Sequence, residues 1–351
     1  MPNTIDFRNR AISSTATLLD AFKLMDHLDK KLLIILDNDA FQGLLSSGDI
    51  QRAIIKGIEL KEPILVATRA SIRYAKHSDS ESEIKKMMLD FRMEMCPIID
   101  DVGNLIRLLF WEDVFGEHES IPKKPFNIPV VIMAGGLGTR MKPLTNVIPK
   151  PLIPFNEKTM VEEIISRFEV HGCTDFILSV NYKAELIKYY LGEANLGVNL
   201  NYILEDKPLG TAGSLSLLTE NMTQTFFVTN CDILINQDYA EILAFHKKNN
   251  HLITVVSSIR SYDIPYGTIE TGQNGQLLKM VEKPEVSFMI NTGMYIIEPE
   301  VLKHIPNDSF MHITTLIEKV NQENSRVGVF PVSEKSWVDI GNWDEYLGNI
   351  R

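Results

Sequence analysis

The sequence predicts an α/β protein with a Rossmann-like, mixed but mainly parallel sheet, preceded by a smaller unit made of two similar halves. Three observations support this prediction. After residue 128, short apolar runs alternate with helical patterns, as in βαβ units. The apolar run at 128–134 leads directly into a glycine-rich turn. Before residue 118, one strand-and-helix pattern occurs twice, roughly 64 residues apart.

Length and composition restrict the class of protein. The chain has 351 residues, of which 44% are hydrophobic and 23% charged, so we expect two globular domains. A net charge of −11 argues against nucleic-acid binding, and no apolar run approaches the roughly 20 residues that cross a bilayer. The three cysteines have no CxxC spacing, and no signal peptide precedes them. We therefore expect a cytoplasmic protein with no nucleic-acid or membrane partner.

The front region carries an internal repeat. A strand pattern is followed by a second strand and a helix start in each copy, and a helical pattern precedes each copy. The strands are expected at 33–37 and 97–101, their continuations at 41–49 and 105–113, and the helices at 18–28, 50–56 and 84–95. Two copies with so long a period predict a pseudo-symmetric pair and not a solenoid.

This pair, residues 1–118, resembles tandem CBS domains, the Bateman module. In that family a Ser or Thr shortly before an Asp at a helix start binds the phosphate and ribose of an adenosine nucleotide, which assigns this role to Ser46, Asp49 and Asp113. The second copy departs from the pattern, because Phe110 stands where the hydroxyl belongs. One adenosine site or none is therefore expected. Helix capping by both Asp residues, in a purely structural or dimerising module, is the alternative. CBS pairs commonly associate face to face, so the resemblance also implies a homo-oligomer.

A polar, proline-containing linker is expected at 119–127, and the second domain at 128–351. Its predicted strands and helices alternate along the chain. The strands are expected at 128–134, 176–180, 200–204, 226–229 and 294–297, and the helices at 184–191 and 212–218.

The turn after residue 134 combines glycines with two cations. Glycines at the carboxyl end of a buried strand let bare N–H groups approach phosphate oxygens. Arg140 and Lys150 would supply the charge that glycine lacks. The turn is not a P-loop, which requires Gly-Lys at 140–141, nor a dinucleotide fingerprint, which requires Gly or Ala at Met141. It predicts a binding site for a nucleoside triphosphate.

The segment 135–152 resembles the signature of the sugar-phosphate nucleotidyltransferases, and the resemblance extends from about residue 129 to the C-terminus. These enzymes join an NTP to a sugar 1-phosphate and release pyrophosphate. The resemblance implies nucleotide contacts at Ala134, Gly135, Gly136, Gly138 and Thr139.

Two aspartates are the predicted metal ligands. Asp232 comes directly after a buried strand, and Asp339 lies in a tight turn near the C-terminus. Alone, either residue is more typical of a turn or cap. With the glycine loop and the family resemblance, they predict a Mg²⁺ site, because oxygen ligands without a His or Cys cluster favour magnesium over zinc.

The resemblance also assigns the sugar and phosphate contacts. Glu282 would accept hydrogen bonds from sugar hydroxyls and Lys283 would contact the sugar phosphate, although a solvated pair before a turn proline is the alternative. Asn291, Thr292 and Gly293 resemble the loop that closes over the sugar. Catalysis would depend on positioning and charge neutralisation by Arg140, Lys150 and Lys283.

The base contact is assigned to Glu205, five residues before Gly210 in a segment that resembles the base-binding loop of the family. An ionised carboxylate only accepts hydrogen bonds, and guanine offers a paired N1–H and N2–H₂ donor edge. The sequence therefore predicts GTP as the nucleotide, with UTP, dTTP or CTP as alternatives.

Fusion of a CBS pair to this domain resembles the glucosamine-1-phosphate guanylyltransferases of bacterial legionaminic acid biosynthesis, which makes glucosamine 1-phosphate the expected acceptor. A different class of function stays open. The chain would then be a nucleotide-sensing regulatory protein whose second domain is catalytically inactive. The presence of all five charged residues, Arg140, Lys150, Asp232, Lys283 and Asp339, argues against that alternative.

Overall fold

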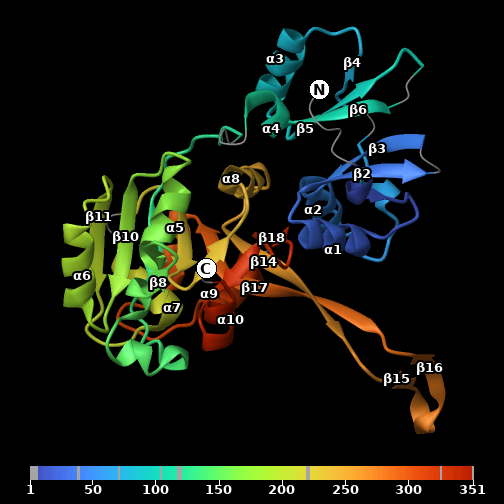
Figure 1. Ribbon diagram of the computed structural model, residues 1–351. Coiled ribbons are helices and arrows are strands. Elements are labelled where there is room, and N and C mark those ends of the chain that lie inside the picture. The colour runs from blue at the N-terminus through green and yellow to red at the C-terminus, as the bar shows by residue number, and fades with distance from the viewer. Residues whose placement is uncertain are drawn as a thin grey trace. The chain divides into compact units, whose positions relative to one another are not determined.

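The computed structural model describes residues 7–37, 40–69, 72–102, 105–116, 121–218, 222–324 and 326–349. The chain divides into two compact units, Met1–Lys123 and Lys124–Arg351 (Figure 1). Residues 119–120 of the expected linker lie outside the described residues. The end of the expected linker, from Lys124, belongs to the second unit, where Phe126 N–H donates to the His171 carbonyl (2.7 Å) and the two rings stack.

The first unit holds two three-stranded sheets, β1-β2-β3 and β4-β5-β6, one from each repeat. The order strand, helix, strand, strand, helix therefore occurs twice. The elements are β1 (Ala11–Ile12), α1 (Leu18–Leu28), β2 (Leu32–Asp37), β3 (Ala40–Ser46), α2 (Ser47–Ile55), β4 (Ala75–Lys76), α3 (Glu81–Phe91), β5 (Met95–Ile99), β6 (Leu105–Phe110) and α4 (Trp111–Phe115).

The helix expected at 84–95 is shorter and begins earlier than predicted. Ser80 caps its N-terminus in a capping box with Glu83, so α3 starts at Glu81. Arg92 takes a left-handed conformation (φ 50°) and its N–H closes the last turn on the Leu89 and Met88 carbonyls. The chain leaves the helix there and enters β5.

An apolar cluster joins the two halves of the first unit. It combines Leu32 and Ile34 of β2 with Met95 of β5 and Leu108 and Phe110 of β6, all buried. Burying these side chains between the halves removes apolar surface from water and makes the two repeats one folded unit.

The second unit is built on a seven-stranded sheet in the order β11-β10-β7-β12-β17-β14-β18. The pairs β11–β10, β10–β7, β7–β12 and β14–β18 are parallel, and β17 is antiparallel to both neighbours. The prediction of a mixed, mainly parallel sheet is confirmed.

The remaining elements of this unit surround the sheet or extend from it. They and the sheet strands are β7 (Val130–Met133), β8 (Pro154–Phe155), β9 (Lys158–Thr159), α5 (Met160–Glu169), β10 (Asp175–Val180), α6 (Ala184–Glu193), β11 (Asn199–Leu204), α7 (Gly210–Gly213), β12 (Phe226–Asn230), β13 (Ile233–Ile235), α8 (Tyr239–Lys248), β14 (Ile253–Asp263), β15 (Thr268–Thr271), β16 (Leu277–Val281), β17 (Glu285–Ile297), α9 (Ile313–Asn324), β18 (Val327–Val332), β19 (Trp337–Asp339) and α10 (Trp343–Asn349). The helix expected at 212–218 is instead the short α7 followed by a 3₁₀ turn, Ser214–Leu218.

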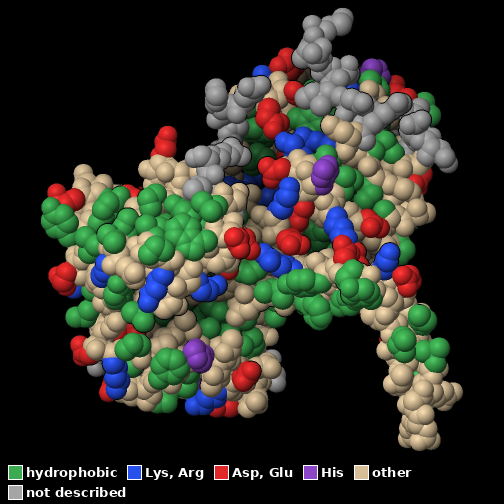
Figure 2. All heavy atoms as spheres, turned by 60° about the horizontal axis from the view of Figure 1, so that its bottom comes forward, with side chains coloured by type: hydrophobic (Ala, Val, Ile, Leu, Met, Phe, Trp, Pro, Cys, Tyr) green, Lys and Arg blue, Asp and Glu red, His purple; other side chains and the backbone are tan. Residues whose placement is uncertain are grey.

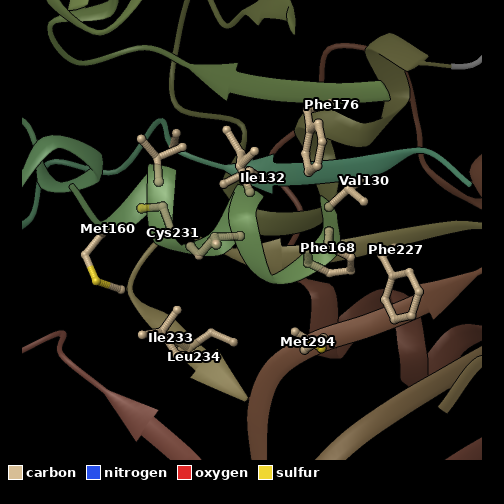
Figure 3. Packing of buried hydrophobic residues seen from close by; sticks show 14 of the residues in the cluster. Val130, Ile132, Met160, Phe168, Phe176, Phe227, Cys231, Ile233, Leu234 and Met294 are labelled. Carbon is tan, nitrogen blue, oxygen red and sulfur yellow. The ribbon is translucent and has the colours of Figure 1, made fainter. Parts of the chain in front are cut away.

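Two apolar clusters fill the two faces of the sheet. Val130 and Ile132 of β7 belong to one cluster and Val131 to the other, so alternate side chains of this strand are buried on opposite faces. Figure 3 shows the first cluster, where Phe168 of α5 and Phe227 of β12 pack beside β7. Their rings meet edge to face at 5.1 Å. This packing fixes the central strands whose carboxyl ends carry the site.

Strands β14 and β17 continue well past the sheet. From Ile259 paired with Met289 to Asp263 paired with Glu285 they form an uninterrupted two-stranded ribbon, and the hairpin β15–β16 lies at its end. We call residues 259–289 the arm. Figure 1 shows the arm projecting away from the rest of the second unit.

Candidate active site

The glycine loop, residues 134–140, follows β7. Contacts with the rest of the protein fix it at Ala134 and at Gly138. Ala134 N–H donates to the Ser179 carbonyl on β10 (2.8 Å). Gly138 has φ 62°, and a Cβ there would lie 2.7 Å from Thr145 Cγ2. The Thr145 hydroxyl donates to the Gly138 carbonyl (2.8 Å). At Gly136, by contrast, a Cβ would meet no protein atom within 4 Å, so the loop is fixed at Gly138 and open at Gly136.

Two residues that sequence reasoning missed support the chain after this loop. Lys183 Nζ donates to the Asn146 carbonyl at 2.6 Å. Trp343 Nε1, from the first turn of α10, donates to the Lys142 carbonyl at 2.9 Å. Neither contact carries a local sequence signal, because each joins segments far apart in the chain.

Asp232 and Asp339 lie close together. Strands β13 and β19 pair antiparallel with Ile233 opposite Asp339, and Ile340 N–H donates to the Asp232 carbonyl (2.9 Å). Gly341 lies between their side chains: a Cβ at this position would be 2.7 Å from Asp232 Oδ2 and 2.8 Å from Asp339 Oδ1. The two predicted metal ligands therefore face one small space, and a side chain larger than that of glycine at position 341 would fill it.

Both predicted cations reach the same space. Lys150 Nζ forms a buried ion pair with Asp232 Oδ2. Arg140 Nη2 lies 3.6 Å from the same oxygen, and it would lie 2.8 Å from a Cβ at Gly341. The Arg140 side chain is largely exposed, whereas those of Lys150 and Asp232 are nearly buried. The site thus has a buried ion pair with an exposed guanidinium at its rim.

Two carboxylates that face one space fit a magnesium ion that takes its other ligands from water and substrate phosphates. Among the described residues, no group of three or more His, Cys, Asp or Glu side chains forms a metal cage. Asp232 and Asp339 would hold the ion. It would supply positive charge to phosphate oxygens when bound.

Glu205 is buried beside the start of the glycine loop. Its Oε1 accepts from Ser179 Oγ (2.5 Å) and its Oε2 from the Leu209 N–H (3.1 Å). Asn181 Nδ2 donates to its backbone carbonyl (2.6 Å). A Cβ at Gly135 would lie 2.7 Å from Oε1, so glycine at this position leaves that oxygen room on the loop side.

Gly210 has a structural partner of its own. It has φ 76°, and a Cβ there would lie 2.6 Å from the Met311 carbonyl. Leu209 and Met311 are joined by a backbone hydrogen bond of 2.9 Å. Packing of the segment before α9 against this turn accounts for the glycine without a ligand.

The triplet 291–293 lies inside β17 and not in a loop. The Thr292 hydroxyl is buried and donates to the Val256 carbonyl (2.8 Å), and Asn291 hydrogen-bonds to Tyr295 Oη. Gly293 (φ 89°) lies against Asn230, whose Nδ2 would be 2.5 Å from a Cβ at position 293. The expectation of a loop is wrong, because β17 continues through a register irregularity opposite Val255–Ser257. The triplet still lies beside the end of β12 that leads to Asp232.

Glu282 and Lys283 are on the arm, and both are exposed. Lys283 takes a left-handed conformation (φ 44°) between β16 and β17. These two residues follow β16 directly, and Figure 1 shows β15 and β16 at the outer end of the ribbon, away from the sheet. The arm residues and the cluster at Gly341 are thus separate in this chain.

In the first unit, Ser46 and Asp49 cap α2, and Asp49 is buried. Asp49 Oδ1 accepts from Arg52 Nη2 (2.5 Å) and Arg69 Nε (2.6 Å), and Arg69 Nη2 also donates to Ser46 Oγ (3.1 Å). Burial opposes ionisation, but the hydrogen bonds from Arg69, Ser46 and Arg52 outweigh it and lower the pKa of Asp49. Asp113 is exposed and caps the short α4 by accepting from the Phe110 N–H (3.0 Å).

Cys231 precedes Asp232 in the site but has no reactive character. Burial, together with the neighbouring Asp232 charge, raises the pKa of its thiol to about 12. It packs in the core cluster seen in Figure 3.

The second unit is similar to known proteins in sequence and in fold. The family model described as nucleotidyl transferase matches residues 129–350. A mannose-1-phosphate guanylyltransferase catalytic subunit beta from Dictyostelium discoideum is 35% identical over 231 residues, which cover 63% of this chain and 63% of the relative. A mannose-1-phosphate guanyltransferase from Yarrowia lipolytica is 36% identical over 231 residues, covering 62% of this chain and 61% of the relative. The chain thus spans less than two thirds of these curated relatives.

Among solved structures, HddC from Yersinia pseudotuberculosis is similar with a TM-score of 0.50 and 26% identity, covering 63% of this chain and 97% of that one. No helix among the described residues is both long and apolar enough to span a membrane. The matched region contains the glycine loop, the cluster at Gly341 and Glu205 in one folded unit. The chain therefore belongs to the nucleotidyl transferase family.

Proposed function

We propose that the second unit transfers a guanylyl group from GTP to a sugar 1-phosphate and releases pyrophosphate. The observation that carries this proposal is the convergence of Asp232, Asp339 and Arg140 on the space beside Gly341, at the sheet edge that also holds the glycine loop. The names of the relatives, which are mannose-1-phosphate guanylyltransferases, support the same reaction.

In this reaction a phosphate oxygen of the sugar 1-phosphate attacks the α-phosphorus of GTP. A bond forms between that oxygen and the α-phosphorus, and the bond from the α-phosphorus to the bridging oxygen of the β-phosphate breaks. Arg140 would compensate the charge that develops on the leaving pyrophosphate, and Lys150 would contact the nucleotide phosphates. A phosphate monoester is already ionised at neutral pH, so the step requires no general base.

We assign the guanine contact to Glu205. Its buried carboxylate is an acceptor-only group, and Gly135 leaves Oε1 room on the side of the loop. Ser179 and the Leu209 N–H hold the two oxygens in place while leaving further lone pairs. These features favour a base with a donor edge, which is the guanine N1–H and N2–H₂ pair.

For the acceptor, we propose glucosamine 1-phosphate, because of the resemblance that the fusion of the two units shows to glucosamine-1-phosphate guanylyltransferases of legionaminic acid biosynthesis. The relatives found by comparison are named for mannose 1-phosphate, so both sugars belong in the test. We place the reaction in the cytoplasm, since Cys96, Cys173 and Cys231 are free and buried.

The experiment is pyrophosphate release by the purified full chain. GTP, UTP, dTTP and CTP are each combined with glucosamine, mannose and glucose 1-phosphates, with and without Mg²⁺. We expect release that depends on Mg²⁺ and is fastest with GTP. Faster release with another nucleotide contradicts the guanine assignment. No release with any pair favours the regulatory alternative, an inactive nucleotide sensor.

For the first unit, residues 1–118, we propose a CBS pair with one adenosine nucleotide site at Ser46 and Asp49. Arg52 and Arg69 support this assignment, because both guanidinium groups are half-exposed and could contact phosphate. Asp113 lacks such neighbours among the residues that the structure describes, which argues for one site and not two. Calorimetric titration with AMP, ADP and ATP tests the proposal. Binding that Arg69→Ala weakens is expected, and no binding by any of the three indicates a purely structural module.

A further inference from the structure

The arm lacks the packing that a two-stranded sheet requires. Beyond residue 258, β14 has lost its neighbour β18, and β17 pairs with β12 only from Met294 onward. Within the described residues, β15 and β16 form a sheet of their own. An isolated two-stranded hairpin is marginally stable in water, and a third strand or a packing partner is needed to hold it.

The arm also exposes large apolar side chains to solvent. Those that are at least half exposed include Tyr266, Leu277, Leu278, Met280, Phe288 and Met289. Figure 2 shows hydrophobic side chains on the projecting arm. Successive side chains of a strand point to opposite faces, so apolar groups are exposed on both faces of the ribbon, and an accumulation of this kind is typical of an interaction site. The arm is therefore built to be covered.

The reach of the ribbon indicates which surface covers it. From Asn291, beside the active site, to Glu285 the strand runs six residues outward, or roughly 20 Å at the rise of a β-strand. The pairing of β14 with β17 is uninterrupted over residues 259–263, so the ribbon would have to break for Lys283 to return to the Asp232 cluster of its own chain. A second copy can receive the arm without that break.

We propose that two copies of this chain exchange arms, so that Glu282 and Lys283 of one copy complete the active site of the other. The inference rests on the proposed function, because it makes Lys283 the cation that contacts the sugar phosphate. A symmetric dimer buries both arms by the same contacts. Each active site then contains Arg140, Lys150, Asp232 and Asp339 from one chain and Lys283 from its partner.

Mixing two inactive variants tests this arrangement. In a mixed dimer of Lys283→Ala and Asp232→Asn, the body of the first chain and the arm of the second form one intact site. We expect each variant alone to be inactive and the co-expressed mixture to recover about a quarter of the wild-type rate, because half of the dimers are mixed and each has one intact site of two. A mixture of Asp232→Asn with Asp339→Asn is the matched control, since both changes lie in the body and no pairing makes an intact site.

Sedimentation separates this inference from the catalytic proposal. We expect the wild type to be a dimer, and Leu278→Asp with Phe288→Asp on the arm to be a monomer with an unchanged circular dichroism spectrum. Leu186→Asp with Tyr189→Asp on α6 is the control for two exposed apolar residues outside the arm, and it should stay dimeric.

Each outcome decides between the possibilities. Arm exchange is overturned by any of four results: the wild type is a monomer, the arm variant is still a dimer, Lys283→Ala has full activity, or the mixture shows no recovery. If the wild type shows no transferase activity, the proposed function fails, and loss of the dimer in the arm variant alone then supports the exchange of arms.

Discussion

The carboxylates of Asp232 and Asp339 face each other across Gly341, although 107 positions separate them in the sequence. The antiparallel pair β13–β19 brings them together, and Lys150 compensates the charge of Asp232 from within the site. This arrangement places two carboxylates where they could coordinate a metal ion, and two cations where they could form ion pairs with a polyphosphate.

Replacing each aspartate by asparagine separates catalysis from stability. We expect Asp339→Asn to lower kcat about 100-fold with little change in the melting temperature, because the asparagine oxygen can still accept from the Gly341 N–H. Asp232→Asn should lose as much activity and also about 3 kcal/mol of stability, since it leaves Lys150 buried without its counter-charge. Pyrophosphate release and urea unfolding measure the two effects. If the two variants are equally stable, Asp232 does not stabilise the protein through its ion pair with Lys150.

Gly341→Ala places a methyl group between the functional atoms. Its Cβ would lie within 2.8 Å of Asp232, Arg140 and Asp339, all three at the ends of side chains that can move. We expect the protein to fold and its kcat to fall at least about tenfold, because the methyl group would push the three side chains out of the positions in which they face one space. Gly348→Ala is the control, since a Cβ there meets no atom within 4 Å. Wild-type kinetics in Gly341→Ala count against a site at this point.

Alanine at the two adjacent glycines should act differently. At Gly135 the Cβ would displace the Glu205 carboxylate, 2.7 Å away, so both the thermal midpoint and the affinity for GTP should fall. At Gly136 a Cβ meets no protein atom, so the thermal midpoint should stay unchanged while the KM for GTP rises severalfold. Thermal unfolding and steady-state kinetics measure both. An unchanged KM in Gly136→Ala means that no nucleotide lies against that position.

A partly buried hydrogen bond outside the site predicts a pH effect on stability. The hydrogen bond between His246 Nε2 and Glu298 Oε1 (3.0 Å) lowers the pKa of Glu298 below its ordinary value of 4.5. A lowered pKa in the folded state stabilises the protein above pH 4.5, and this contribution disappears as the pH falls through the lowered pKa. Glu298→Gln should therefore be less stable by about 2 kcal/mol at pH 7, with a smaller loss on acidification. Urea unfolding of the wild type and of Glu298→Gln at about pH 7 and pH 4 checks this. If acidification lowers the free energy of unfolding equally in the two proteins, the prediction is contradicted.

Much of the fold could be predicted from the sequence. The helix at Leu18–Leu28 and the strand ends at Val180 and Leu204 carry strong periodic and apolar patterns. The glycine loop could be recognised because it follows a strand buried on both faces, and Asp232 could be recognised for the same reason.

Other features depend on contacts that no local pattern encodes. The meeting of Asp232 with Asp339 requires two three-residue strands that pair although they lie far apart in the sequence. The projection of the arm depends on β14 and β17 continuing past their sheet neighbours, and so the location of Lys283 could not be predicted from its motif. Thr292 has the polar neighbours of a loop residue, yet its hydroxyl is buried inside a strand pair.

The most direct test of the central claim is the stoichiometry of product formation at the Asp232–Asp339 site. GTP, Mg²⁺ and a sugar 1-phosphate are incubated with the wild type and with the double variant Asp232→Asn, Asp339→Asn, and a GDP-sugar and pyrophosphate are quantified by chromatography. The account predicts equal amounts of both products from the wild type and neither from the double variant. Product formation by the double variant at the wild-type rate, or none by the wild type with any sugar 1-phosphate, would contradict it.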